Sequence, residues 1–236
     1  MKTVISIIKF LLTRKKEIAK MHHLKTQEIV KGIYAIKTKG ANFYVIKNED
    51  GYIAIDAGDG EKTIAESELR KLNIEPEKIS AVLLTHSDFD HTSALGLFKN
   101  ATIYISQQEM QIVNGSVPRM FGIKNKLKLN YDFNIIYGED DLYFGELKVK
   151  PILTPGHTTG SLSYLLDDKY LFVGDTLSLK DGQVELFNSL FNTDDNIQKQ
   201  SLKRLAQLQN AEYIFTAHYG FSDSYQEAFD NFRQHH

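Results

Sequence analysis

The residues best suited to chemistry stand together in one short stretch, which runs Thr-His-Ser-Asp-Phe-Asp-His from position 85 to position 91. It contains two imidazoles, His86 and His91, and two carboxylates, Asp88 and Asp90. His86, Asp88 and Asp90 alternate along the chain, so an extended loop would project them on one side, while His91 can turn toward a second point. Such a cluster can serve two metal ions about 3.5–4 Å apart, which hold a bridging hydroxide and polarise a substrate oxygen.

Two further histidines extend this pattern. The chain has eight histidines, of which four lie near its ends and the others are His86, His91, His157 and His218. Each of these last four follows a predicted strand, in a loop rich in glycine, aspartate or threonine. Such loops gather at one edge of layered α/β folds, where functional sites are usually built. A lone histidine is more often a hydrogen-bonded loop residue, and Asp90 alone could cap a helix, but neither explanation covers the whole cluster.

The composition is that of an ordinary globular protein. The chain has 236 residues, 42% hydrophobic and 25% charged, with a net charge of -2 and no cysteine. Without cysteine, disulfides, a thiolate nucleophile and a cysteine-ligated metal are excluded. Because there is no basic excess, we expect no nucleic-acid partner.

The first 24 residues differ from the rest of the chain. The run from Val4 to Leu12 is apolar except at Ser6 and Lys9, and three basic residues follow it. The run is too short to span a bilayer, and no small-residue cleavage site follows it. We predict a basic amphipathic N-terminal segment over residues 1–24, packed on the domain, with peripheral contact to a membrane surface as the alternative. We expect a cytoplasmic protein.

Residues 25–236 contain no repeat or linker, which predicts one domain. Short β-rich runs bounded by turn residues predict strands, and helical spacing of apolar residues predicts helices. The strands are predicted at 32–36, 43–47, 52–55, 79–84, 102–106, twice within 142–152, and at 161–166, 170–173 and 213–216. The helices are predicted at 61–72, 92–98, 195–208 and 225–232, and residues 107–141 as irregular. Strands in two groups with interspersed helices indicate an α/β layered fold.

Several motifs, in order along the chain, resemble those of the metallo-β-lactamase superfamily. The stretch 86–91 resembles its His-x-His-x-Asp-His signature, and 56–58 looks like its early Asp-Gly strand end. The stretch 154–161 looks like its Pro-Gly-His-Thr loop, 174–176 like the loop with its bridging aspartate, and 217–220 like the loop with its last histidine. The resemblance implies an αββα sandwich with the site at one edge, between the two sheets.

The resemblance also implies roles for these residues. It implies a first metal ion held by His86, Asp88 and His157, and a second held by Asp90, His91 and His218, with Asp175 as the bridge. Asp90 is further implied as the catalytic residue that passes a proton to the leaving group, and Asp56 as a residue that orients a ligand. The implied function is hydrolysis of an ester, lactone, thioester, amide or phosphoester by a hydroxide bridging two divalent metal ions, with zinc as the first expectation.

Asp88 departs from the superfamily pattern, because most members have histidine at this position. A carboxylate ligand shifts the preference of a site from zinc toward manganese or iron. His86, His157 and Asp88 together also form the two-histidine, one-carboxylate set of non-haem iron oxygenases. The flavodiiron branch of the superfamily carries a carboxylate here too, a glutamate. The alternative function is therefore a di-iron oxidoreductase that receives electrons from a separate partner.

A local basic run lies in the segment predicted to be irregular, at Arg119, Lys124, Lys126 and Lys128. Such a run is typical of a solvated loop face. The functional alternative is a loop over the site that recognises an anionic small-molecule substrate.

Overall fold

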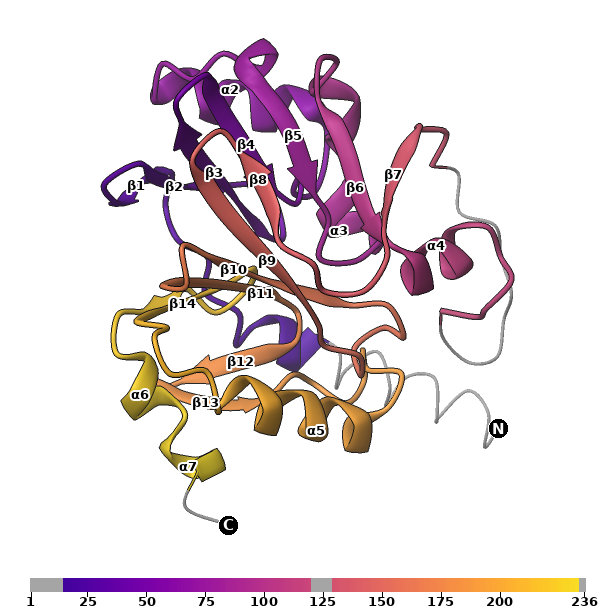
Figure 1. Cartoon of the computed structure of the whole chain (residues 1–236), viewed down its shortest axis with the longest axis vertical. Coiled ribbons are helices and arrows are strands. Elements are labelled where there is room, and N and C mark those ends of the chain that lie inside the picture. Colours follow the sequence, from indigo (N-terminus) through magenta and orange to yellow (C-terminus); the bar gives the residue numbers. More distant parts are fainter. Residues whose placement is uncertain (1–14, 120–128, 234–236) are drawn as a thin grey trace.

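Two β-sheets lie face to face at the centre of the molecule, and helices cover their outer faces (Figure 1). The computed structural model describes residues 15–119 and 129–233. The first sheet consists, in spatial order, of β1 (Gln27–Val30), β2 (Ile33–Lys37), β3 (Asn42–Asn48), β4 (Gly51–Ile55), β5 (Ile79–Leu83), β6 (Thr102–Ser106) and β7 (Phe133–Ile136). The second consists of β15 (Phe221–Ser222), β14 (Tyr213–Thr216), β11 (Tyr170–Gly174), β10 (Leu162–Leu166), β9 (Leu147–Leu153) and β8 (Leu142–Phe144). This layering confirms the predicted αββα sandwich.

The alternation of side chains along the strands builds two cores at once. In β5, Ala81 and Leu83 lie in the core between the sheets, whereas Val82 packs in the core under the helices of the first sheet. Burial on both faces explains why β5 is apolar except at the exposed Ser80. Each fully buried aliphatic side chain of this kind contributes about 1.5–3 kcal/mol relative to exposure. The sheets are thereby fixed against each other, and the loops at their edge start from rigid strands.

Helices complete the outer layers. α2 (Lys62–Lys71) buries Leu69 against the first sheet, and α5 (Asp195–Leu205) buries Leu205 over the second. The Asp194 side chain caps α5, because its carboxylate accepts hydrogen bonds from two backbone N–H groups of the first turn. This cap fixes the start of α5 beside the loop that carries His157, since the Asp194 N–H donates to the Gly156 carbonyl over 2.9 Å.

The prediction that residues 107–141 are irregular was wrong in two places. The segment contains α4 (Gln107–Val113) and the strand β7. The Ser106 side chain caps α4 by accepting a hydrogen bond from the Glu109 N–H, and β7 pairs in parallel with β6 at the edge of the first sheet. Both elements are too short for hydrophobic periodicity to reveal them, and tertiary contacts decide them instead.

Other elements differ from the prediction in their bounds. The helix predicted at 92–98 is α3 (Phe89–Thr92) followed by a single 3-10 turn, and the last predicted helix is divided into α6 (Tyr225–Ala228) and α7 (Asp230–Arg233). The hairpin of β12 (Leu177–Lys180) and β13 (Gln183–Leu186) was not predicted. The early start of α3 matters for the site, because it places Asp90 and His91 on a helical turn.

Residues 15–24 pack on the loop that carries His218. The His22 N–H donates to the His218 carbonyl over 2.9 Å, and the Asn42 side chain exchanges hydrogen bonds with the backbone of Leu24. Most of the predicted amphipathic segment, residues 1–14, lies outside the described residues, so the domain division at residue 24 stays a prediction. Within residues 15–119 and 129–233, no helix is both long enough and apolar enough to cross a membrane.

Candidate metal centre

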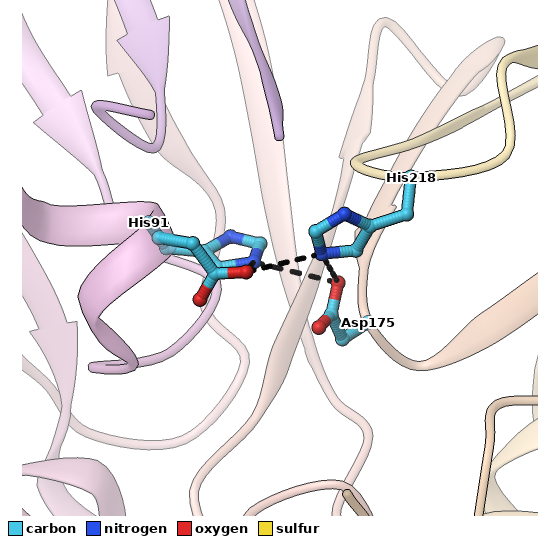
Figure 2. Close-up of side chains that lie close together, drawn as sticks. His91, Asp175 and His218 are labelled. Atoms are coloured by element: carbon cyan, nitrogen blue, oxygen red, sulfur yellow. Dashed lines mark ion pairs between the residues drawn. The ribbon is translucent and has the colours of Figure 1, made fainter. Parts of the chain in front are cut away.

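The candidate site lies where strand ends of both sheets meet. β4 and β5 run parallel, so Asp56 and His86, which follow them, leave the first sheet at the same edge. β11 and β14 are also parallel, and they bring Asp175 and His218 together from the second sheet. His91 does not lie in a loop as predicted, but in α3. Figure 2 shows His91, Asp175 and His218 pointing toward one another from these three elements.

The Asp175 carboxylate faces two pairs of histidines, one with each oxygen. Its Oδ1 lies 3.4 Å from His91 Nε2 and 3.2 Å from His218 Nε2. Its Oδ2 lies 3.5 Å from His157 Nε2 and 4.0 Å from His86 Nε2. Asp175 is therefore placed where its carboxylate could contribute to two metal ions, one beside each histidine pair.

The other two carboxylates each approach one pair of histidines. Asp90 Oδ2 lies 3.4 Å from His218 Nε2, and Asp88 Oδ2 lies 3.2 Å from His157 Nε2 and 3.6 Å from His86 Nε2. The structure thus gathers all seven predicted ligands in one place. We call His86, Asp88 and His157 with Asp175 Oδ2 the first site, and Asp90, His91 and His218 with Asp175 Oδ1 the second site.

The second site is the more compact of the two. One ligand atom from each of its four residues lies within 4.8 Å of the others. At the first site the same distance holds only for His86, His157 and Asp175, and not for Asp88. Three buried atoms that face the centre have no hydrogen-bond partner in the described parts of the chain, namely His86 Nε2, His91 Nε2 and Asp175 Oδ1. Each such atom costs about 1–3 kcal/mol when it stays unsatisfied. These unpartnered nitrogen and oxygen atoms fit a centre in which divalent ions would accept their lone pairs.

Every histidine of the centre has a partner at its other ring nitrogen, Nδ1. Such a partner fixes the ring and leaves Nε2 to bind a metal ion. These partners are Thr85 Oγ1 at 3.0 Å for His86, Asp56 Oδ2 at 2.8 Å for His91, Asn192 Oδ1 at 3.3 Å for His157 and His23 Nε2 at 3.4 Å for His218. All four imidazoles are therefore oriented before any ion binds.

Asp56 contacts both ends of the ligand-bearing stretch 85–91. Its carboxylate accepts hydrogen bonds from the Thr85 N–H and hydroxyl over 2.7 and 2.8 Å, as well as contacting His91. Its backbone has a positive φ of 63°, a conformation in which aspartate and asparagine are enriched among non-glycine residues. Asp56 thus contacts the imidazole of a predicted ligand, His91.

Replacing Asp56 by asparagine is expected to weaken zinc binding at the second site by about 10–100-fold, because the charge that orients His91 is lost. Asparagine suits the backbone conformation, so the fold should persist. A competition titration with a chromophoric chelator measures the effect. The matched control is Asp181→Asn, which makes the same change at a φ of 50° in an exposed turn. Unchanged zinc affinity in Asp56→Asn would show that the contact with His91 does not support the site.

The two sites differ in charge. Burial disfavours the protonated form of His218, but Asp175 and Asp90 outweigh burial and raise the pKa of His218 to about 9. Against burial, Asp175 also contributes to raising the pKa of His91 well above its usual value. Burial would raise the pKa of Asp175, yet His218 and His91 hold it well below the ordinary value. At the first site, burial lowers the pKa of His157. Ions that bind the second site therefore have to displace protons.

A cavity of about 550 Å³ opens on the centre. Its polar floor includes Asp88, Asp90 and Asp175 together with two of the histidines. Its apolar wall comes from Phe89, Phe187 and Phe191, and from Ile18 and Met21 of the N-terminal segment. Lys39 and Asp59 add one cation and one carboxylate to the lining. The volume is typical of a small-molecule site.

Sequence reasoning missed several residues of this site. His23 was set aside with the histidines near the chain ends, yet it contacts His218. Glu109 is fully buried and joins the two ligand loops, accepting hydrogen bonds from the Ser87 N–H at 2.8 Å and the Thr158 hydroxyl at 2.6 Å. Arg119 lies at the site as the basic-run hypothesis allowed, but it pairs with Asp88. No local sequence signal identifies such partners, and Lys124, Lys126 and Lys128 lie outside the described residues.

Comparison with known proteins agrees with this geometry. The family model described as the metallo-beta-lactamase superfamily matches residues 37–218. A probable metallo-hydrolase from Methanocaldococcus jannaschii is 32% identical over 152 residues, which cover 64% of this chain and 63% of that protein. A hydroxyacylglutathione hydrolase from Glaesserella parasuis is 29% identical over 180 residues, which cover 74% of this chain and 64% of that protein.

Solved structures show the same fold. The beta-lactamase from Chitinophaga pinensis superposes with a TM-score of 0.69 at 21% identity, covering 93% of this chain and 94% of that one. The two curated relatives are matched over less than two thirds of their own length. The family match spans most of the chain and includes all seven candidate ligands. The chain therefore belongs to the metallo-β-lactamase superfamily.

Proposed function

We propose that this chain is a hydrolase that uses two divalent metal ions to cleave an ester, lactone, thioester, amide or phosphoester bond in a small molecule. The observation that carries the proposal is the position of Asp175, whose two oxygens face the two separate histidine pairs. Zinc is the first metal to test, since four imidazoles contribute to the ligand set. Ions held in this way polarise a substrate oxygen and activate water for attack.

The chain's own residues would bind the substrate and move a proton. The apolar wall of the cavity, with Phe89 and Phe191, suits the hydrocarbon part of a substrate, and Lys39 suits an anionic group on it. Asp90 lies at the boundary between the centre and the cavity, and its side chain is 35% exposed. From there its carboxylate can accept a proton from water and deliver it to a leaving group.

Hydrolysis is favoured over the di-iron oxidoreductase. The curated relatives described above are named as hydrolases. Because one of these relatives is named a hydroxyacylglutathione hydrolase, an acylglutathione thioester is the first substrate to test.

We expect protein saturated with zinc, manganese or iron to hold two ions per chain by elemental analysis and to hydrolyse at least one member of a panel. The panel comprises an acylglutathione, a lactone, an aryl ester, a β-lactam and a phosphodiester. Chelation should abolish the activity and added metal should restore it. The variant His91→Ala should lose activity, whereas His22→Ala, which changes an imidazole outside the ligand set, should keep it. A stoichiometry of one ion after saturation, or hydrolysis that survives chelation, would contradict the proposal.

A further inference from the structure

An arginine contacts the first site at the atoms that a metal ion would use. The Arg119 guanidinium forms a bidentate ion pair with Asp88, in which Nε lies 2.6 Å from Oδ1 and Nη2 lies 2.5 Å from Oδ2. The same Nη2 lies 3.0 Å from His157 Nε2. Because Nδ1 of His157 faces Asn192, its Nε2 is the nitrogen left to bind a metal. One guanidinium nitrogen therefore lies against two of the ligand atoms of the first site.

Arg119 is held in this position by further contacts. Nη1 donates to the His157 carbonyl and Nη2 to the Phe191 carbonyl, each over 3.1 Å. The Thr193 hydroxyl donates to the carbonyl of Arg119 itself over 3.2 Å. The side chain is only 14% exposed. A planar guanidinium with several fixed partners is already organised, so moving it away costs several charge-assisted hydrogen bonds.

The second site lacks such a competitor. Within the described ranges, no arginine or lysine nitrogen lies within ion-pair distance of Asp90 or Asp175, whose partners are histidines. The compact set of ligand atoms includes Asp90 at the second site but does not include Asp88 at the first. Besides their difference in compactness and charge, the two sites thus differ in the arginine on Asp88, which directly occupies ligand atoms of the first site.

An arginine can also contact a ligating carboxylate without competing with the metal ion. An arginine that merely orients a ligating carboxylate would bind the oxygen that faces away from the metal and leave the other free. Arg119 instead occupies both oxygens, including Oδ2, which faces His86 at 3.6 Å and His157 at 3.2 Å. A divalent ion bonded to Oδ2 would also lie close to the guanidinium charge, which repels it.

We propose that Arg119 makes the first site the weaker of the two, because its guanidinium competes with a metal ion for Asp88 and His157. The second site fills first, and the first site fills only as Arg119 leaves Oδ2 and His157. This inference rests on the two-ion centre proposed above, and it concerns the order and strength of metal binding rather than the reaction.

Calorimetric titration of chelator-treated protein with Zn²⁺, in the presence of a competing chelator, tests the proposal. Wild-type protein should bind Zn²⁺ in two separated steps, and His86→Ala should remove the weaker one. Arg119→Ala should tighten the weaker step by about 10–100-fold, the range expected from losing one charge-assisted hydrogen bond, and leave the tighter step unchanged. Arg119→Lys, which keeps the charge but loses the fork, should tighten it less.

The matched control is Arg204→Ala, which removes another bidentate arginine–carboxylate pair, with Glu139 on the surface, and should alter neither step. The tighter step reports that each variant is folded. A weaker step that loosens or stays unchanged in Arg119→Ala would overturn the inference and leave the hydrolase proposal intact. Two equally tight steps in the wild type would do the same. Wild-type protein that binds no Zn²⁺ would overturn both proposals together.

Discussion

Replacing Asp90 by asparagine is expected to lower turnover by about 10²–10⁴-fold, the usual cost of losing one general acid–base group. The Asp90 carboxylate lies 3.4 Å from His218 Nε2 and lines the cavity, so it combines the positions of a ligand and of a proton carrier. The amide is of equal size but cannot carry the proton. The measurement is kcat on the panel member that the wild-type protein hydrolyses.

The fold should survive this change, because within the described chain the ion-pair partners of Asp90 are imidazoles of the centre. Circular dichroism and thermal unfolding check this. The control Asp50→Asn makes the same change in the exposed turn between β3 and β4 and should leave kcat unchanged. If Asp90→Asn turned over at near wild-type rates with both ions bound, Asp90 would have no part in proton transfer.

Zinc affinity at the second site is expected to rise at least about tenfold for each pH unit between pH 6 and pH 8. The pKa of His218 is raised to about 9, so this imidazole holds a proton throughout that range and zinc has to displace it. One displaced proton changes the apparent zinc affinity tenfold for each pH unit. The affinity should therefore stop rising only near pH 9. A second displaced proton, from His91, would steepen the slope.

Proton release measures this directly. Titrations with Zn²⁺ in two buffers of different ionisation enthalpy should show one or more protons released at pH 7. The free energy of unfolding of the chelator-treated protein should fall as the pH rises, whereas its zinc affinity rises. A histidine whose pKa rises on folding contributes stability below about pH 6.5 that is lost as the pH rises through the folded pKa near 9. Zinc binding at pH 7 without proton release would show that His218 is neutral before the ion arrives.

The sequence alone was enough to predict which residues gather at the candidate site. Four of the predicted ligands each follow a strand that its own apolar run predicts, namely His86, His157, Asp175 and His218. A turn rich in glycine, threonine or aspartate ends each of these strands. Parallel strands then place their carboxyl ends at one edge, so residues far apart in the chain were expected to meet. The order of the motifs added the αββα layering and the division of the ligands between two ions.

Local patterns were insufficient for the short elements. α4 has only seven residues and β7 only four. Each is stabilised by contacts with its neighbours, because so short an element shows no clear hydrophobic periodicity of its own. The start of α3 was placed three residues too late, because Asp90 looked like the residue that could cap a helix starting at Thr92. In the structure Asp88 is the residue before that helix, and its carboxylate makes no capping hydrogen bond.

The partners of the ligands were decided by the tertiary structure. Asp88 meets Arg119 across 31 positions of the chain, and His218 meets His23 across 195. Neither contact leaves a trace in spacing or composition, because only the tertiary packing brings these residues together. Residue types and local spacing therefore determined which side chains could bind metal. The packing of distant segments decided how each ligand is oriented and which of them a competing cation already holds.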